Sequence, residues 1–253
     1  MIKLKSPQEI ESIAASGKIL AKVFKKVLKE VKIGVSLKYL NDLADKFVKE
    51  AGAEPAFFGY KPSGAKHPYR ASICASVNDV IVHGFPNNYK LKNGDVLKLD
   101  FGVKYQGFYS DAATTVGVGK ISKEAERLIK AARVALEEAI KVTKEGNHLG
   151  DIGFIIAQTA KKYGVKVVEG LTGHGIGFDL HEDPNIYNFG EQGRGIELKT
   201  GMVLAIEPMF AIGANKIIQK ADEGWATADG SLSAHFEHTV AIMEKKPKIL
   251  TSN

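Results

Sequence analysis

The chain has 253 residues, enough for one large domain or two fused halves with a substantial core. Hydrophobic residues make up 44% and charged residues 25%, as in folded globular proteins, and no apolar run approaches the ~20 residues of a membrane helix. The net charge of +6 comes with lysines dispersed over helical segments, so we expect no membrane and no specific nucleic acid as a partner.

The first half of the chain begins with two predicted helices. Ser6 is a capping residue, Pro7 occupies the first helical position and Glu9 the third, and the apolar spacing that follows predicts a helix near 7–30. Ser36 opens a second helix, and Gly52 suits its C-terminal end. Sequence rich in strand-forming residues follows, at roughly 70–83 and 95–118.

The second half repeats this order. Ser122 starts one helix, and Gly146-Asn147 precedes another that ends near Gly164. Strand-rich segments follow at roughly 166–174, 201–213 and 236–243. Helix pairs that alternate with runs of strands predict an α+β protein, with an antiparallel sheet and helices on its outer face. We expect one domain over 1–253, built from an N-terminal half of about 1–120 and a C-terminal half of about 121–253.

One ten-residue motif occurs twice, 107 positions apart. Residues 91–100 (LKNGDVLKLD) recur as 198–207 (LKTGMVLAIE), and each copy ends on a carboxylate, Asp100 or Glu207. If two related halves pack face to face, these carboxylates approach each other from equivalent strand positions. Two carboxylates that lie close together repel each other unless a cation lies between them, so the repeat predicts a metal site.

Two more carboxylates occupy corresponding places. Asp111 lies on the second arm of a predicted hairpin that begins at Asp100 and turns near Gln106-Gly107. Facing like charges usually point to solvent or destabilise the pair, but the apolar flanks of both aspartates favour burial. A buried Glu207 is more often salt-bridged than metal-bound, yet the repeat favours a metal, and Glu237 sits in the strand expected to pair with it. The four carboxylates predict a dinuclear cage.

Histidines add nitrogen donors. His174 lies in Gly-His-Gly-Ile-Gly, where flanking glycines let the backbone approach a ligand, although such a histidine alone is usually structural. His83 and His181 are equally weak signals in isolation. Oxygen-rich ligands with one imidazole suit Mn, Fe, Co or Zn.

Taken together, these residues resemble type I methionine aminopeptidase over nearly the whole chain. The local sequences that carry the resemblance are Asp-Phe-Gly, Ser-Asp-Ala-Ala, Gly-His-Gly-Ile-Gly, Ile-Glu-Pro-Met and Phe-Glu-His-Thr. The resemblance implies the pita-bread fold, two pseudo-symmetric αα-β halves that clasp two divalent ions of Co, Mn, Fe or Zn. It assigns the ligands by position: Asp100 chelates one ion, His174 and Glu207 serve the other, and Asp111 and Glu237 bridge both.

The resemblance also implies an activity and the residues around it. The enzyme removes N-terminal methionine, preferably before a small second residue, by attack of metal-activated water. Glu207 then shuttles a proton, His83 and His181 both contact the substrate, and His181 or His83 stabilises the oxyanion. Tyr69, Cys74 and Trp225 resemble the pocket for the methionine side chain, in which Cys74 is a wall and not a nucleophile. Leu180 replaces an aromatic residue common there.

The expected partners are the N-termini of nascent polypeptides, with transient ribosome association left open and a monomer as the expected state. An N-terminus without the features of a secretory signal and a single cysteine favour the cytoplasm.

Three alternatives stay open at this point. An Xaa-Pro peptidase of the same fold uses the same ligand types but usually carries an additional N-terminal domain. A non-catalytic pita-bread binding protein is expected to have lost metal ligands. A mononuclear iron oxygenase needs fewer carboxylates than this chain offers.

Overall fold

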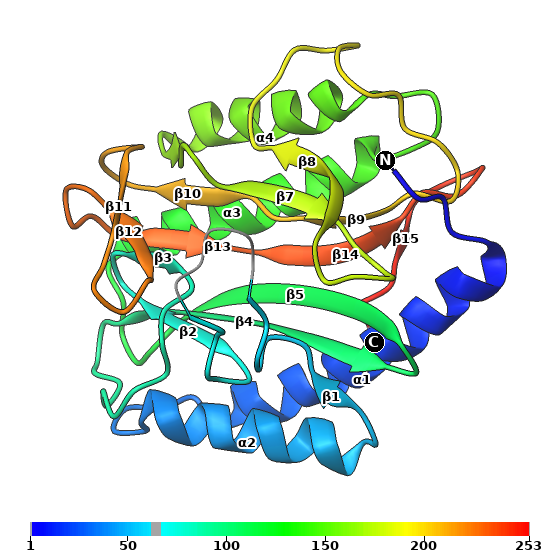
Figure 1. The fold of residues 1–253 in the computed structure, drawn as a ribbon. Helices are drawn as coiled ribbons and strands as arrows, with labels where there is room; N and C mark the ends of the chain where they lie inside the picture. Colours follow the sequence, from blue (N-terminus) through cyan, green and yellow to red (C-terminus); the bar gives the residue numbers. More distant parts are fainter. Residues whose placement is uncertain (1, 62–66, 253) are drawn as a thin grey trace.

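The computed structural model describes residues 2–61 and 67–252, which form four helices with the predicted order (Figure 1). At the start of the first helix, the Ser6 Oγ accepts the Glu9 N–H at 3.3 Å while a Glu9 carboxylate oxygen accepts the Ser6 N–H at 2.7 Å, so the predicted cap is confirmed. The last helix ends at Gly164, whose φ of 64° suits glycine. The helices are α1 (Pro7–Lys29), α2 (Leu37–Glu50), α3 (Lys123–Val142) and α4 (Leu149–Tyr163).

The predicted strand-rich segments contain most of the longer strands. They hold β2 (Cys74–Val77), β3 (Val80–Val82), β4 (Val96–Tyr105), β5 (Phe108–Gly117), β6 (Lys166–Val167), β7 (Thr172–Gly175), β9 (Val203–Ile206), β10 (Met209–Ala211) and β14 (Glu237–Ala241). Six strands were not predicted: β1 (Glu54–Pro55), β8 (Glu182–Tyr187), β11 (Ile217–Gln219), β12 (Trp225–Thr227), β13 (Ser233–His235) and β15 (Lys248–Ile249). Five of these have two or three residues, too few to show alternation, and β8 contains Pro184, which argues against a strand.

A nine-stranded sheet joins the two halves of the chain. Its main path runs β1-β4-β5-β14-β9-β7-β8, and β2 and β15 pair with β4 and β14. All the pairings that the described residues make in this sheet are antiparallel, as expected for the α+β class. The halves meet where β5 pairs with β14, near the middle of the path.

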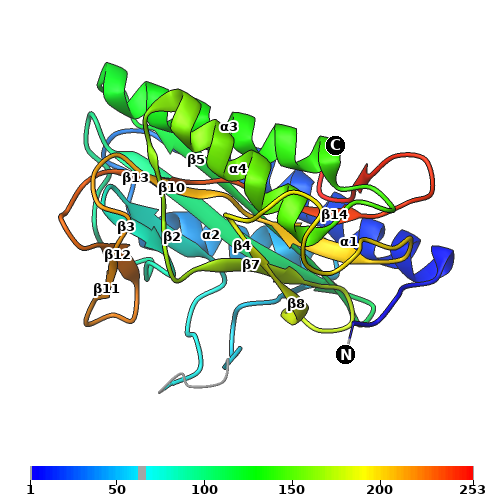
Figure 2. The ribbon, with the colours of Figure 1, turned by 90° about the horizontal axis from the view of Figure 1, so that it is seen from above.

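The helices cover the sheet and enclose two large apolar clusters. One cluster lies between α1, α2 and the strands β2 and β4, where Phe24 stacks on Phe101 with ring centroids 4.1 Å apart. The other lies between α3, α4 and the strands β9, β10 and β14. Figure 2 shows α3 and α4 on one side of the sheet, with β8 and the β11–β12 hairpin on the other. None of the helices in the described part of the chain has the length and apolarity needed to cross a bilayer.

Candidate metal centre

Three neighbouring strands place the predicted carboxylates on one face of the sheet. Asp100 of β4 lies opposite Ala113 of β5, and Ala113 lies opposite Glu237 of β14. Asp111 precedes Ala113 by two residues and therefore points to the same face. Asp100 and Glu237 thus occupy one transverse row across the seam between the halves, with Asp111 in the adjacent row.

The C-terminal half contributes its ligand candidates in the same way. In the β9–β14 pair Ile206 lies opposite His238, and one further step in that register brings Glu207 beside Glu237. His174 of β7 lies opposite Ala205, two residues before Glu207 and on the same face. The structure therefore brings together all five residues that the sequence analysis selected as metal ligands.

The four carboxylates are buried, and the chain supplies too few cationic or hydrogen-bonding groups to stabilise their negative charges. Exposure is 8% for Asp100 and Glu207, 3% for Asp111 and 2% for Glu237. Burial raises the pKa of Asp100 and of Glu207 to about 7. Burial first, and then the neighbouring carboxylates, also raise the pKa of Asp111 and of Glu237.

Two carboxylate oxygens in this cluster lack a hydrogen-bond partner, although they are buried: Asp100 Oδ1 and Glu237 Oε1. Buried polar atoms nearly always have a partner, so atoms without one call for a missing group. A divalent cation satisfies carboxylate oxygens and neutralises their mutual repulsion at once. The residues therefore fit a metal.

His174 is oriented as a ligand. Its Nδ1 lies 2.9 Å from the Gly175 carbonyl oxygen, which only accepts, so Nδ1 carries the proton and Nε2 offers a lone pair. Nε2 lies 3.7 Å from Glu207 Oε1. Two sets of potential ligands have donor atoms within 4.8 Å of one another: Asp111, His174 and Glu237, and Glu207, His235 and Glu237. Glu237 belongs to both.

His235 is the residue of this cluster that the sequence analysis missed. It ends β13, is 1% exposed, and places Nε2 3.1 Å from Glu207 Oε2. A signal was present, because His235 precedes Glu237 by two residues, the spacing that puts two strand side chains on one face.

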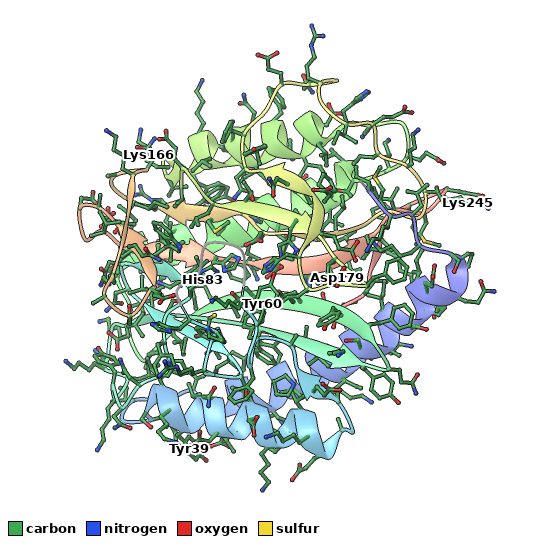
Figure 3. All side chains as sticks on the ribbon, viewed as in Figure 1. Tyr39, Tyr60, His83, Lys166, Asp179 and Lys245 are labelled. Carbon is green, nitrogen blue, oxygen red and sulfur yellow. The ribbon has the colours of Figure 1, made fainter. Side chains whose placement is uncertain are left out.

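The two histidines predicted to contact substrate lie on the open side of the cluster. The His181 ring packs edge-on against His174, with centroids 4.2 Å apart, and its Nδ1 lies 2.6 Å from the Tyr60 hydroxyl. His83 is exposed and follows the last residue of β3 with a φ of 58°. Figure 3 shows His83 and Tyr60 near the middle of the same face. Tyr60 was not singled out from the sequence, since a lone tyrosine carries no pattern.

The predicted pocket residues surround the segment that leads into His83. Cys74 lies opposite Asp100 in the β2–β4 pair and is 3% exposed. Burial, and then Asp100, raise the pKa of its thiol well above the ordinary value, which suits a wall and not a nucleophile. The Tyr69 hydroxyl donates to the Gly84 carbonyl at 3.1 Å, and Trp225 pairs with Val82. Leu180, adjacent to His181, is buried.

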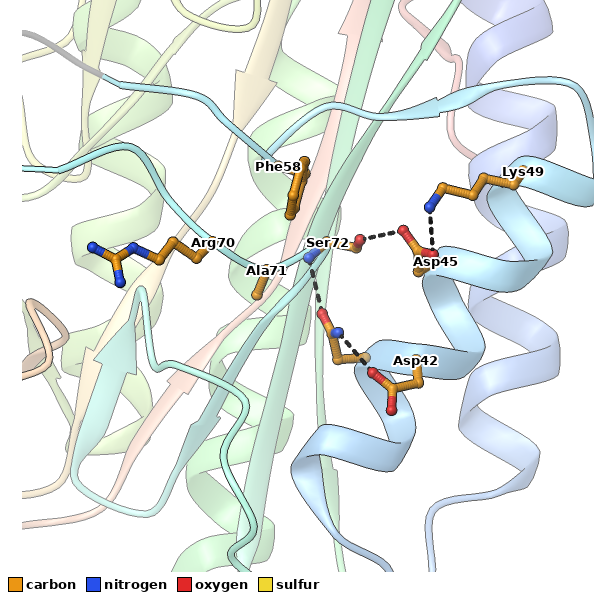
Figure 4. A pocket seen from close by; sticks show the side chains of 8 residues that line it. Asp42, Asp45, Lys49, Phe58, Arg70, Ala71 and Ser72 are labelled. Atoms are coloured by element: carbon orange, nitrogen blue, oxygen red, sulfur yellow. Dashed lines mark hydrogen bonds and ion pairs between the residues drawn. The ribbon is translucent and has the colours of Figure 1, made fainter.

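A separate surface pocket lies beside α2 and the segment before β2 (Figure 4). Its polar groups are matched within the chain: the Asn41 side-chain oxygen accepts the Ser72 N–H at 2.9 Å, and the Ser72 hydroxyl donates to Asp45 at 2.8 Å. These bonds anchor the strand that carries Cys74 to α2. None of the residues that line the pocket belongs to the carboxylate cluster, so the pocket is not part of that site.

Comparison with known proteins identifies the family. A model described as metallopeptidase family M24 matches residues 11–244. The chain belongs to this family. It is 44% identical over 253 residues to methionine aminopeptidase from Clostridium perfringens, covering 99% of each protein. The crystal structure of methionine aminopeptidase from Thermotoga maritima superposes with a TM-score of 0.95 at 40% identity, covering 100% of both chains.

The fold extends to more distant members of M24. Prolidase from Pyrococcus furiosus matches 99% of this chain and 65% of its own length, with a TM-score of 0.79 at 23% identity, which shows a shared fold. The predicted resemblance to type I methionine aminopeptidases and the predicted pita-bread fold are confirmed. This M24 protein is a metal-dependent hydrolase, so the binding-protein and oxygenase alternatives are set aside.

Proposed function

We propose that this M24 hydrolase removes the initiator methionine from nascent polypeptides, preferably when the second residue is small. The observation that carries the proposal is the buried cluster of Asp100, Asp111, His174, Glu207 and Glu237, assembled in a chain that matches methionine aminopeptidases over its full length. We expect it to act as a cytoplasmic monomer on polypeptide N-termini. Transient ribosome association stays a prediction that the net charge of +6 permits.

The cluster would hold two divalent ions of Co, Mn, Fe or Zn. Asp100 would hold one ion, His174 and Glu207 would hold the other, and Asp111 and Glu237 would be shared between them. The presence of Glu237 in both candidate ligand sets supports its bridging role. When bound, the ions lower the pKa of a water molecule and polarise the scissile carbonyl.

Proton transfer falls to Glu207. This carboxylate lies close to two imidazoles, 3.7 Å from His174 Nε2 and 3.1 Å from His235 Nε2. It takes a proton from the attacking water and delivers it to the leaving amine.

His181 is arranged to donate to the developing oxyanion. Desolvation, together with His174 and His83, lowers its pKa, so the ring is neutral near pH 7 and carries one N–H. When the Tyr60 hydroxyl donates to Nδ1, that N–H is on Nε2 and is free for the substrate. His83, on the same face, is the second group that contacts substrate.

Selectivity for methionine rests on the pocket of Tyr69, Cys74 and Trp225. Its walls are an aromatic ring, a neutral thiol and an indole, which suit an unbranched thioether. The buried Leu180 contributes an aliphatic side chain beside His181.

The test measures methionine release from Met-Ala-Ser and Met-Leu-Ser, with metal-free protein and after addition of Mn, Co or Fe(II). Metal-dependent cleavage of Met-Ala-Ser alone supports the proposal. Cleavage confined to an Xaa-Pro control peptide would favour the proline-directed alternative, and no cleavage with any metal would contradict both.

A further inference from the structure

The His235 side chain is buried with both ring nitrogens unmatched. Neither Nδ1 nor Nε2 has a hydrogen-bond partner, although the residue is 1% exposed. Its backbone is fixed, because the His235 N–H donates to Thr115 Oγ1 at 2.9 Å and the Thr115 hydroxyl donates to the His235 carbonyl at 2.6 Å. A fully buried imidazole without a partner is rare and calls for a bound group.

The ring faces ligand candidates. Nε2 lies 3.1 Å from Glu207 Oε2, yet the contact lacks the geometry of a hydrogen bond. Around an octahedral ion with bonds of about 2.1 Å, adjacent ligand atoms lie about 3 Å apart. The spacing of the two atoms is therefore that of neighbouring ligands on one ion.

Glu237 completes the arrangement. Donor atoms of Glu207, His235 and Glu237 all lie within 4.8 Å of one another. The three residues come from the ends of β9, β13 and β14, and the main chain holds each of these ends. A cation placed among them satisfies the unmatched Nε2 together with the unmatched Glu237 Oε1.

We propose that His235 Nε2 is a sixth protein ligand and binds the ion that Glu207 holds. The inference rests on the proposed metal centre and adds a second imidazole to it. Nitrogen ligands favour later divalent metals over Mn, following the Irving–Williams order. His235 therefore shifts the preference of this ion towards Co or Zn.

The direct test uses Co(II)-loaded protein with ¹⁵N-labelled histidine. A histidine bound to Co(II) through Nε2 gives a hyperfine-shifted Nδ1–H signal in proton NMR, and both rings are buried enough to slow exchange. We expect two such signals in the parent protein, from His174 and His235, and one in His235→Gln. A single signal in the parent would overturn the ligand assignment while leaving the metal centre intact. Absence of any shifted signal would overturn the metal centre itself.

A second test compares metal affinities by competition titration. His235→Gln should lose at least about tenfold in affinity for Co(II), and less for Mn(II). The matched control is His238→Gln, because His238 neighbours Glu237 but its Nδ1 contacts Thr251 Oγ1 at 2.8 Å. Equal losses for both metals, or a comparable loss in the control, would overturn the proposal. Circular dichroism shows that each variant is folded, and the NMR test on the parent protein needs no variant.

Discussion

Lys98 of β4 and Ser233 of β13 connect the two halves of the chain through a buried ammonium group. Lys98 Nζ donates to Ser233 Oγ at 3.2 Å, to the Ser233 carbonyl at 3.3 Å and to the Asn78 carbonyl at 2.7 Å. The side chain is 1% exposed, and it points to the same side of β4 as Asp100, two residues further on. The contact ties the first half of the chain to the strand that positions His235.

We expect Lys98→Met to destabilise the protein by about 1–3 kcal/mol, because it removes charged hydrogen bonds from buried carbonyls. Burial lowers the pKa of Lys98 to about 7, so urea unfolding is measured at pH 6, where the ammonium is charged. Lys46→Met on the exposed face of α2 is the control and should change stability by less than about 0.5 kcal/mol. If Lys98→Met is as stable as the parent or more stable, the cost of burying the ammonium group is larger than the contribution of its hydrogen bonds.

Asp111→Ala should abolish peptide cleavage without unfolding the protein. Even partners outside the ligand set change activity by about 10–100-fold, so loss of a bridging ligand should exceed about 100-fold. The backbone of Asp111 stays bonded to Thr239 Oγ1, at 2.9 Å from its N–H and 2.8 Å from its carbonyl. Turnover is measured with Met-Ala-Ser, and Asp179→Ala, on an exposed side chain, serves as the control. Near-normal turnover in Asp111→Ala would refute the dinuclear model.

Glu207→Gln should reveal how the cluster responds to pH when metal is absent. Because burial raises the pKa of Glu207 from 4.5 to about 7, its contribution to stability is complete below pH 4.5 and is lost as pH rises to 7. Glutamine has no such loss. In the presence of a chelator, the free energy of unfolding of Glu207→Gln should therefore rise relative to that of the parent between pH 4.5 and 7. The relative increase should be on the order of 3 kcal/mol.

The measurement is urea unfolding at several pH values between 4.5 and 7.5. Added Co(II) should make the parent more stable than Glu207→Gln at pH 7.5, because the parent keeps a metal ligand that the variant lacks. Glu54→Gln, with a side chain 74% exposed, is the control. A stability difference that does not change with pH would mean that Glu207 is not held in a desolvated site.

Gly17→Ala in α1 should destabilise the protein, although alanine favours helices. A Cβ added at Gly17 would lie 2.1 Å from the Leu250 carbonyl oxygen, which is backbone and cannot move aside cheaply. Overpacking of this kind typically costs about 1–3 kcal/mol. Thermal unfolding should show a lower melting temperature for Gly17→Ala, while Lys18→Ala on the exposed face leaves it nearly unchanged. A higher melting temperature for Gly17→Ala would contradict this packing of α1 against the C-terminal segment.

Much of the fold was predictable because its signals are local. Ser6, Ser36 and Ser122 cap helices whose apolar spacing is regular, and the duplicated motif correctly indicated that Asp100 and Glu207 belong to one cluster. The repeat was informative because β4 and β9, the equivalent strands that lead into these two carboxylates, flank the β5–β14 pair on either side.

The remaining features depend on contacts between segments that are distant in sequence. β11 and β12 are three residues each, and β12 pairs with both β11 and β3, which no local pattern shows. Tyr60 gains a role only from its contact with His181, 121 positions away. His235 was missed because its contact with Glu207 depends on where β13 lies relative to β9, although its two-residue spacing from Glu237 was a usable signal.

The pairing of β5 with β14 has a consequence for when the chain can bind metal during its synthesis. Asp100 and Asp111 are translated well before His174, Glu207 and Glu237, and the two groups of ligands meet only when β14 pairs with β5. A partly synthesised chain therefore presents two acidic groups and no closed cage, so it has little affinity for a transition metal. Metal binding therefore has to follow the synthesis of β14, and hydrolytic activity is withheld until that strand has joined the sheet.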